Sequence, residues 1–174
     1  IWMPNVFQFE HQPALSCDEW HHIVYRFRHG PNPSDGHTMD KIVDGVVVEQ
    51  LAAGGLPMPG NGPLFIGSYL GQNAFFHGAM DELRLSRIWR SEDWLLTSYR
   101  QQKNPSDFLA AGPEQAGTLM AFEKLLGIDP AKVAGRLTNF PVLVSLQDPD
   151  LRTVSNGGHV ESSEGWDIVF TLPD

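Results

Sequence analysis

The strongest pattern of apolar and polar residues lies between residues 62 and 86. Two runs rich in apolar and aromatic residues, 64–70 and 75–85, are separated by Gly71, Gln72 and Asn73. Short polar breaks of this kind reverse one strand into the next. The sequence therefore predicts a β-hairpin, around which we expect the first half of the chain to be organised.

The second run of this predicted hairpin assigns a direction to each of its side chains. Because strand side chains alternate between two faces, Leu83 and Leu85 share one face with Asp81, and Glu82 and Arg84 share the other. We expect the leucine face to be buried and Glu82 to pair with Arg84 in solvent. Asp81 is then carried inward, where a buried carboxylate needs a hydrogen-bonding partner.

Two further strand signals precede this hairpin. Residues 21–28 place alternate apolar side chains on one face. The pair Asp44-Gly45 lies between the apolar runs 41–43 and 46–48, and this pair is the strongest short hairpin signal, because a type I′ turn needs positive φ at both central residues. The expected core of the first half consists of the inward positions of these strands: Ile23, Tyr25, Phe27, Leu64, Ile66, Leu83 and Leu85.

A helix is predicted after the hairpin, and a boundary after the helix. Ser91 is a favourable N-cap, it is followed by acidic residues in the first turn, and apolar positions recur at helical spacing from Trp94. Residues 103–117 are rich in Pro and Gly without periodicity. We therefore expect a first domain at 1–108, a linker at 109–117 and a second β-rich unit at 118–174, with strands near 119–128, 140–146 and 166–170.

Four motifs of the first half occur together and in order. They are WHHI at 20–23, VDG at 43–45, FIG at 65–67 and GAMDELRL at 78–85. In this combination the chain resembles the C-terminal part of the laminin-G-like, concanavalin A-like jelly rolls of bacterial surface and secreted proteins. The resemblance implies an all-β fold, a partial and N-terminally incomplete jelly-roll β-sandwich. It also implies a secreted, periplasmic or cell-surface location.

The second half carries a shorter resemblance. The run LTNFPVLV at 137–144, with WDIVF at 166–170, is similar to the start of a functionally uncharacterised β-rich module. Such modules occur beside laminin-G-like domains in bacterial envelope proteins. The resemblance implies that 118–174 is the beginning of such a module, cut off at its C-terminal side.

Charge and composition narrow the classes of partner. The chain has 174 residues, 41% of them apolar, which is enough to build a core. Its net charge is −9, and its 12 Lys and Arg are scattered, whereas nucleic-acid binding needs a basic stripe. No apolar run approaches the ~20 residues that span a bilayer, and no signal peptide is seen. A single cysteine, Cys17, permits no internal disulfide.

No catalytic constellation stands out in the sequence. Concanavalin A-like glycoside hydrolases place paired carboxylates on one strand face as Glu-x-Asp-x-x-Glu, and no such run occurs. A Gly-x-Ser-x-Gly nucleophile elbow and Cys-x-x-Cys zinc pairs are also missing. His21 and His22 point to opposite faces, which disfavours a shared metal ion. We predict no enzyme activity and no cofactor, with calcium at Asp81 as the alternative, since related jelly rolls often hold this ion.

The function that best fits these observations is a non-catalytic recognition or adhesion module of a larger protein, binding a glycan or a protein through its loops. Two alternatives stay open: an accessory module of a carbohydrate-active hydrolase whose catalytic residues lie elsewhere, and a structural spacer. The candidate loops are 29–37 and 70–76 with their flanks, although turn residues there can serve their own turns. The candidate ligand-binding residues are Tyr69, Gln72, Asn73, Asn32, Asp35 and His37.

Overall fold

The computed structural model describes residues 15–28, 37–53, 63, 65–68, 71–117 and 120–171. The chain divides into two compact units, Ile1–Arg90 and Ser91–Asp174. This division falls before the predicted linker at 109–117, because the helices that follow Ser91 pack with the C-terminal residues. The domain bounds drawn from the sequence stay a prediction.

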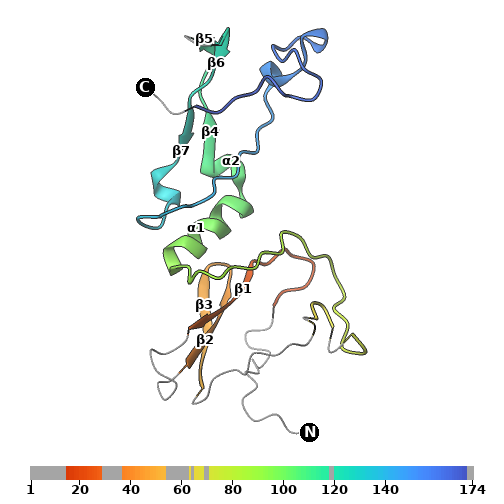
Figure 1. Cartoon of the computed structure of the whole chain (residues 1–174), viewed down its shortest axis with the longest axis vertical. Coiled ribbons are helices and arrows are strands. Elements are labelled where there is room, and N and C mark those ends of the chain that lie inside the picture. The colour runs from red at the N-terminus through yellow and green to blue at the C-terminus, as the bar shows by residue number, and fades with distance from the viewer. Residues whose placement is uncertain are drawn as a thin grey trace. The chain divides into compact units, whose positions relative to one another are not determined.

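The described residues of the first unit contain one antiparallel sheet of three strands, in the order β1-β2-β3. The strands are β1 (Ile23–Arg28), β2 (His37–Val43) and β3 (Val46–Ala53), shown in Figure 1. Asp44 and Gly45 join β2 to β3 with φ of 53° and 81°. Positive φ at both positions is the signature of a type I′ turn, so the predicted Asp-Gly hairpin is confirmed.

The faces of β1 differ from the prediction at three positions, whereas Phe27 is half-buried. Ile23 and Tyr25 are exposed, whereas Arg26 is buried. The reason is a charge pair: Arg26 lies opposite Asp40 in the register of β1 and β2, and the two side chains form a buried ion pair. Burial of a paired charge has overridden the apolar alternation, and the apolar core of the sheet is instead formed by Ile42 and Val43.

The predicted hairpin at 62–86 is not a regular hairpin in the structure. None of the described residues between 65 and 90 lies in one of the strands. The predicted burial of Leu83, Leu85 and Ile66 is wrong. Leu83 and Leu85 are 68% and 78% exposed, and Ile66 is exposed as well. Glu82 has a φ of 52°, and a left-handed residue breaks the alternation on which the prediction rested. Leu64 lies outside the described residues.

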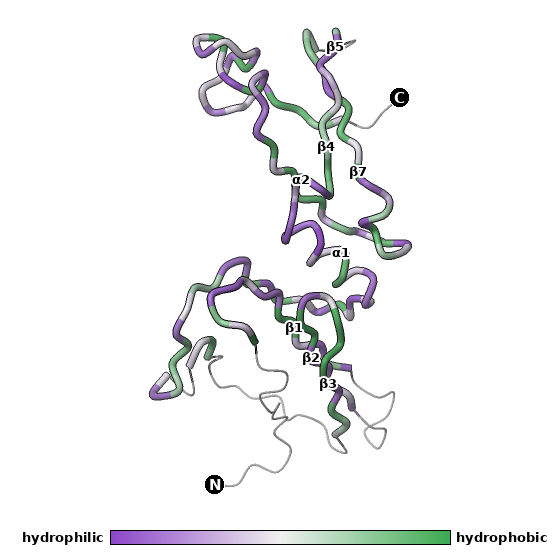
Figure 2. Tube along the Cα trace, turned by 180° about the vertical axis from the view of Figure 1, so that it is seen from behind, coloured by the Kyte–Doolittle hydropathy of each residue, from purple (hydrophilic) through white to green (hydrophobic). Residues whose placement is uncertain are grey.

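The second unit begins with the predicted helix, α1 (Glu92–Lys103). The Ser91 hydroxyl accepts a hydrogen bond from the Trp94 N–H at 3.2 Å, which confirms the N-cap. A one-turn helix α2 (Pro105–Phe108) follows, and its Phe108 is buried. The C-terminal end of α1 is hydrophilic, as Figure 2 shows.

Short strands complete the second unit. The strand β4 (Leu109–Ala111) pairs with β7 (Leu126–Ile128), and β5 (Gln115–Ala116) pairs with β6 (Phe122–Glu123), both antiparallel. Three 3-10 turns follow, η1 (Pro130–Lys132), η2 (Pro149–Leu151) and η3 (Val154–Asn156). Strands are thus present within the predicted stretch 119–128, whereas 140–146 and 166–170 form no regular strand.

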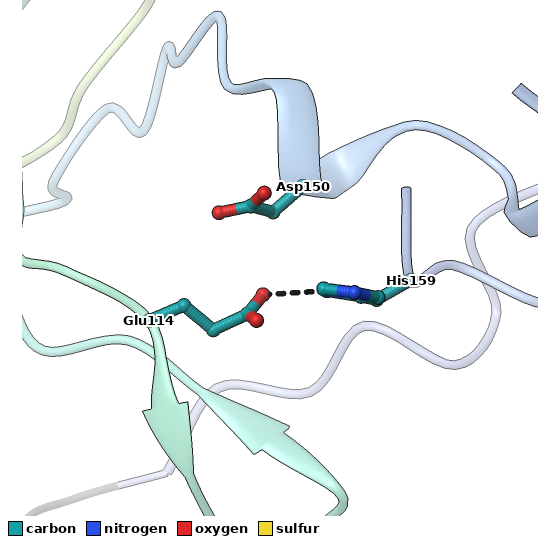
Figure 3. Close-up of side chains that lie close together, drawn as sticks. All are labelled: Glu114, Asp150 and His159. Atoms are coloured by element: carbon teal, nitrogen blue, oxygen red, sulfur yellow. Dashed lines mark hydrogen bonds and ion pairs between the residues drawn. The ribbon is translucent and has the colours of Figure 1, made fainter. Parts of the chain in front are cut away.

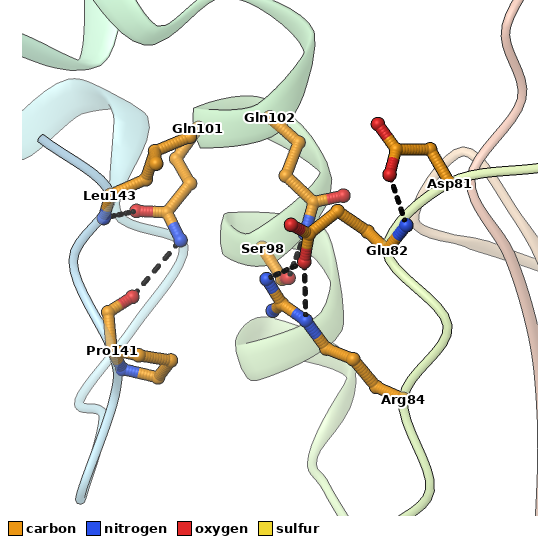
Figure 4. A network of polar contacts seen from close by, with 8 residues as sticks. All are labelled: Asp81, Glu82, Arg84, Ser98, Gln101, Gln102, Pro141 and Leu143. Carbon is orange, nitrogen blue, oxygen red and sulfur yellow. Dashed lines mark hydrogen bonds and ion pairs between the residues drawn. The ribbon is translucent and has the colours of Figure 1, made fainter. Parts of the chain in front are cut away.

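A side chain takes the place of a partner strand at residues 140–146. The Gln101 amide donates to the Pro141 carbonyl oxygen at 3.0 Å and accepts from the Leu143 N–H at 3.0 Å, as Figure 4 shows. Thr97 accepts the Ala134 N–H in the same way. Helix α1 therefore binds the backbone through its polar side chains, and the run predicted to be a strand takes these hydrogen bonds from a helix.

Candidate ligand-recognition site

The six predicted ligand-binding residues do not form one described cluster. Gln72 and Asn73 are exposed, as the prediction requires. Tyr69, Asn32 and Asp35 lie outside the described residues. Their assignment to a binding site stays a prediction.

His37 is placed differently from the expectation. Its side chain is 0% exposed, and its ring stacks on Phe27 with centroids 6.1 Å apart and planes 18° apart. A ring at this depth at the start of β2 contributes to the packing of the sheet. In this conformation it cannot touch a ligand at the surface.

An apolar and aromatic surface lies on residues 65–66 and 75–88 and was not predicted, and three of its members, Ile66, Leu83 and Leu85, were expected in the core. Its exposed members, here called the apolar ridge, are Phe65, Ile66, Phe75, Phe76, Met80, Leu83, Leu85 and Ile88. The Phe76 N–H donates to the Gly67 carbonyl oxygen at 2.7 Å and ties the two runs of the ridge together. The ridge is thus continuous along the backbone with the exposed amides of Gln72 and Asn73.

Two glycines leave room for aromatic rings of the ridge. A Cβ at Gly71 would lie 3.0 Å from the Phe65 ring, and a Cβ at Gly78 would lie 2.9 Å from the Phe76 ring. Both rings therefore occupy space that any side chain at these glycines would need. Both side chains are also exposed, and an exposed aromatic ring favours stacking against an apolar surface of a ligand.

Polar groups at the C-terminal end of the ridge are also exposed. The predicted pair is confirmed: the Arg84 guanidinium donates to Glu82 Oε2 at 2.6 and 3.1 Å (Figure 4). The burial predicted for Asp81 is wrong, because its side chain is exposed and Oδ1 accepts the Glu82 N–H at 2.8 Å. The left-handed backbone at Glu82 interrupts the strand alternation of side chains on which the prediction for Asp81 relied.

The hairpin turn is anchored by a histidine. Asp44 Oδ2 lies 2.8 Å from His21 Nδ1, its Oδ1 accepts the His22 N–H at 2.9 Å, and the Asp44 N–H donates to the His22 carbonyl oxygen. The hydrogen bond with Asp44 raises the pKa of His21 above its usual value. Burial lowers the pKa of His22. These contacts fix the residues before β1 to the β2–β3 turn.

A buried polar network crosses the sheet and was missed by the sequence analysis. Asp40 accepts from Arg26 Nε at 2.8 Å through Oδ2 and from Gln50 Nε2 at 2.7 Å through Oδ1. The Arg26 guanidinium carbon lies 4.1 Å from the Trp89 ring centroid, and Nη1 donates to the Arg90 carbonyl oxygen. Opposite charges at central positions of two adjacent strands were the available signal.

The sequence of the first unit matches a known family. Residues 2–95, more than half of the chain, match the family model of the concanavalin A-like lectin/glucanase superfamily. The chain belongs to this superfamily. The match confirms the predicted all-β, concanavalin A-like fold class and the first of the two resemblances. No curated protein and no solved structure gives a comparable match.

Membership of the superfamily indicates a general class of function for the first unit. Concanavalin A-like domains of this kind commonly bind carbohydrate or protein within larger proteins. None of the helices in the described ranges is long and apolar enough to cross a membrane. The resemblance of residues 137–170 to an uncharacterised β-rich module stays a prediction.

Proposed function

We propose that the chain is a non-catalytic recognition or adhesion module of a larger secreted, periplasmic or cell-surface protein. Its partner is a glycan or a protein surface, bound through the loops of the first unit. The observation that carries this proposal is the apolar ridge, which exposes aromatic rings close in sequence to the exposed Gln72 and Asn73, within residues that match a superfamily of lectins and glucanases.

The chemistry of the ridge suits a sugar. The apolar face of a pyranose packs on an aromatic ring, while amides and carboxylates satisfy its hydroxyl groups. Phe75 and Phe76 are exposed and follow Asn73 by two and three residues. Asp81 offers an exposed carboxylate further along the same segment. Rings and hydrogen-bonding groups therefore occur together on one stretch of chain.

Glycan-array screening followed by calorimetry tests the proposal. The full chain is compared with Phe76→Ala and Asn73→Ala, and with Trp166→Ala as the control, because Trp166 is an exposed aromatic residue of the second unit. We expect the unchanged chain to bind at least one glycan class. Binding should weaken about tenfold or more in each ridge variant, which corresponds to about 1.4 kcal/mol, and should not change in Trp166→Ala.

Two results would contradict the proposal. Equal affinity of the unchanged chain and both ridge variants would remove the ridge as the binding site. Absence of binding to every glycan on the array, together with no partner in a cross-linking screen of cell-surface proteins, would leave the spacer role as the better explanation.

A further inference from the structure

A group of three ligand-type side chains lies in the second unit, outside the residues that match the superfamily. Glu114, Asp150 and His159 each offer one ligand atom, and these atoms all lie within 4.8 Å of one another. Figure 3 shows the three side chains pointing toward a common space from separate segments of the chain. Glu114 precedes β5, Asp150 lies in η2, and His159 follows η3.

The backbone holds two of these residues in fixed relation. The His159 N–H donates to the Asp150 carbonyl oxygen at 2.9 Å, and the Val160 N–H donates to the Arg152 carbonyl oxygen at 3.1 Å. Gly158, which precedes His159, is buried. A Cβ at Gly158 would lie 2.1 Å from the Arg152 carbonyl oxygen. Residues 148–160 therefore form a closed loop that presents the carboxylate and the imidazole on the same side.

The side chains are also supported by neighbours. The His159 ring stacks on Phe122 of β6, with centroids 3.8 Å apart and planes 9° apart, and its Nδ1 lies 2.7 Å from Glu114 Oε2. Lys124 Nζ lies 2.6 Å from Asp150 Oδ2 and also contacts Asp148. Contacts that orient metal ligands in this way are a regular part of metal sites, because they reduce the ordering cost of binding.

We propose that Glu114, Asp150 and His159 bind a divalent transition-metal ion, with Zn²⁺ as the best match. Zinc binds imidazole nitrogen and carboxylate oxygen at about 2.0–2.2 Å. Three protein ligands are enough for a zinc site in which water takes the fourth position. In a tetrahedral zinc site two ligand atoms lie about 3.4 Å apart, so ligand atoms up to 4.8 Å apart must close by about 1.4 Å at most. Calcium and magnesium take oxygen ligands, so the imidazole selects against them.

Binding replaces one set of contacts by another. The hydrogen bond between His159 and Glu114 gives way to two metal–ligand bonds, and the neutral imidazole keeps its one proton on the ring nitrogen that does not bind the ion. Lys124 keeps its contact with Asp148 and offsets part of the negative charge around the ion. The ion would link the β5–β6 hairpin to the loop at 148–160.

Titration of the full, EDTA-treated chain with ZnCl₂ in a calorimeter tests the proposal. We expect one zinc ion per chain, with a Kd of about 10 μM or lower. The variant His159→Phe keeps a flat ring on Phe122 and deletes the ligand nitrogen, and Glu114→Gln deletes the charge at constant size. Each should weaken binding about tenfold or more. The control His77→Phe changes an exposed histidine of the first unit and should bind zinc as the unchanged chain does.

A second measurement does not depend on any variant. Co²⁺ bound in place of zinc should give the visible absorption of a four-coordinate ion, whereas the spectrum of the hydrated ion alone would refute the site. The proposal would also be overturned by saturable zinc binding that persists unchanged in correctly folded His159→Phe and Glu114→Gln, as judged by circular dichroism.

Discussion

Replacing Asp40 by Asn is the most informative perturbation of the first unit. The carboxylate is 1% exposed and accepts hydrogen bonds on both oxygens, from Arg26 on β1 and from Gln50 on β3. An asparagine has a single oxygen, so its NH₂ group must face one of these two donors. The substitution also leaves the charge of Arg26 buried, with its ion-pair partner removed.

The expected cost follows from the burial of the pair. Removal of one partner of a buried ion pair costs about 3–5 kcal/mol, and we expect about 3 kcal/mol here because asparagine still offers one acceptor. With an m-value of about 1–3 kcal/mol/M in urea, the unfolding midpoint should fall by about 1–3 M. The exposed pair of Glu82 and Arg84 is the matched control, and Arg84→Met should cost at most about 1 kcal/mol.

Urea unfolding followed by tryptophan fluorescence is a suitable assay, since the Trp89 ring lies against the Arg26 guanidinium. The double variant Arg26→Met, Asp40→Leu replaces the charges by apolar groups and should recover much of the loss. Equal destabilisation by Asp40→Asn and Arg84→Met would refute the reasoning. A double variant as unstable as the sum of the losses in the single variants Arg26→Met and Asp40→Leu would also refute it.

Three further predictions concern local features. Gly45→Ala should destabilise the hairpin by about 1–2 kcal/mol, because a left-handed φ is costly for a residue with a Cβ. Urea unfolding measures this loss of stability, and an unchanged free energy of unfolding would contradict the type I′ turn. His21 has a folded-state pKa above 6.5, so its stabilisation is fully present below pH 6.5 and is lost as the pH rises through the folded pKa. The stability difference between His21→Asn and the unchanged chain should therefore be larger at about pH 5.5 than at about pH 8.5, with His22 cancelling in the comparison. Gln101→Met should cost about 1–3 kcal/mol and speed hydrogen exchange at the Leu143 amide, and unchanged exchange would show that the amide is held by other groups.

Local signals were predicted correctly from the sequence. The Asp44-Gly45 turn and the Ser91 cap depend on the backbone needs of a few adjacent residues, so their residue types suffice to identify them. The helix that follows Ser91 was predicted for the same reason. The fold class followed from four short motifs in order, and the superfamily match confirms it.

The direction of side chains was predicted less well, because it depends on partners distant in sequence. Apolar alternation placed Tyr25 inward, yet the ion pair of Arg26 with Asp40 decided the face. At residues 140–146 the apolar run had the composition of a strand, but Gln101 supplies its hydrogen bonds. The convergence of Glu114 with His159 was invisible for a similar reason, since 45 residues separate them and neither belongs to a spaced metal motif.

The division of the chain at Arg90 and Ser91 has a practical consequence for making the parts separately. The superfamily match ends at residue 95, inside α1, so a polypeptide cut there would keep the Ser91 cap with a single helical turn. One turn is not stable alone, because helix nucleation is costly. A cut after Arg90 keeps the carbonyl group that Arg26 binds and leaves the whole helix with its cap on the other fragment. Expression of 1–90 and 91–174 should therefore give more stable fragments than a division at the end of the family match.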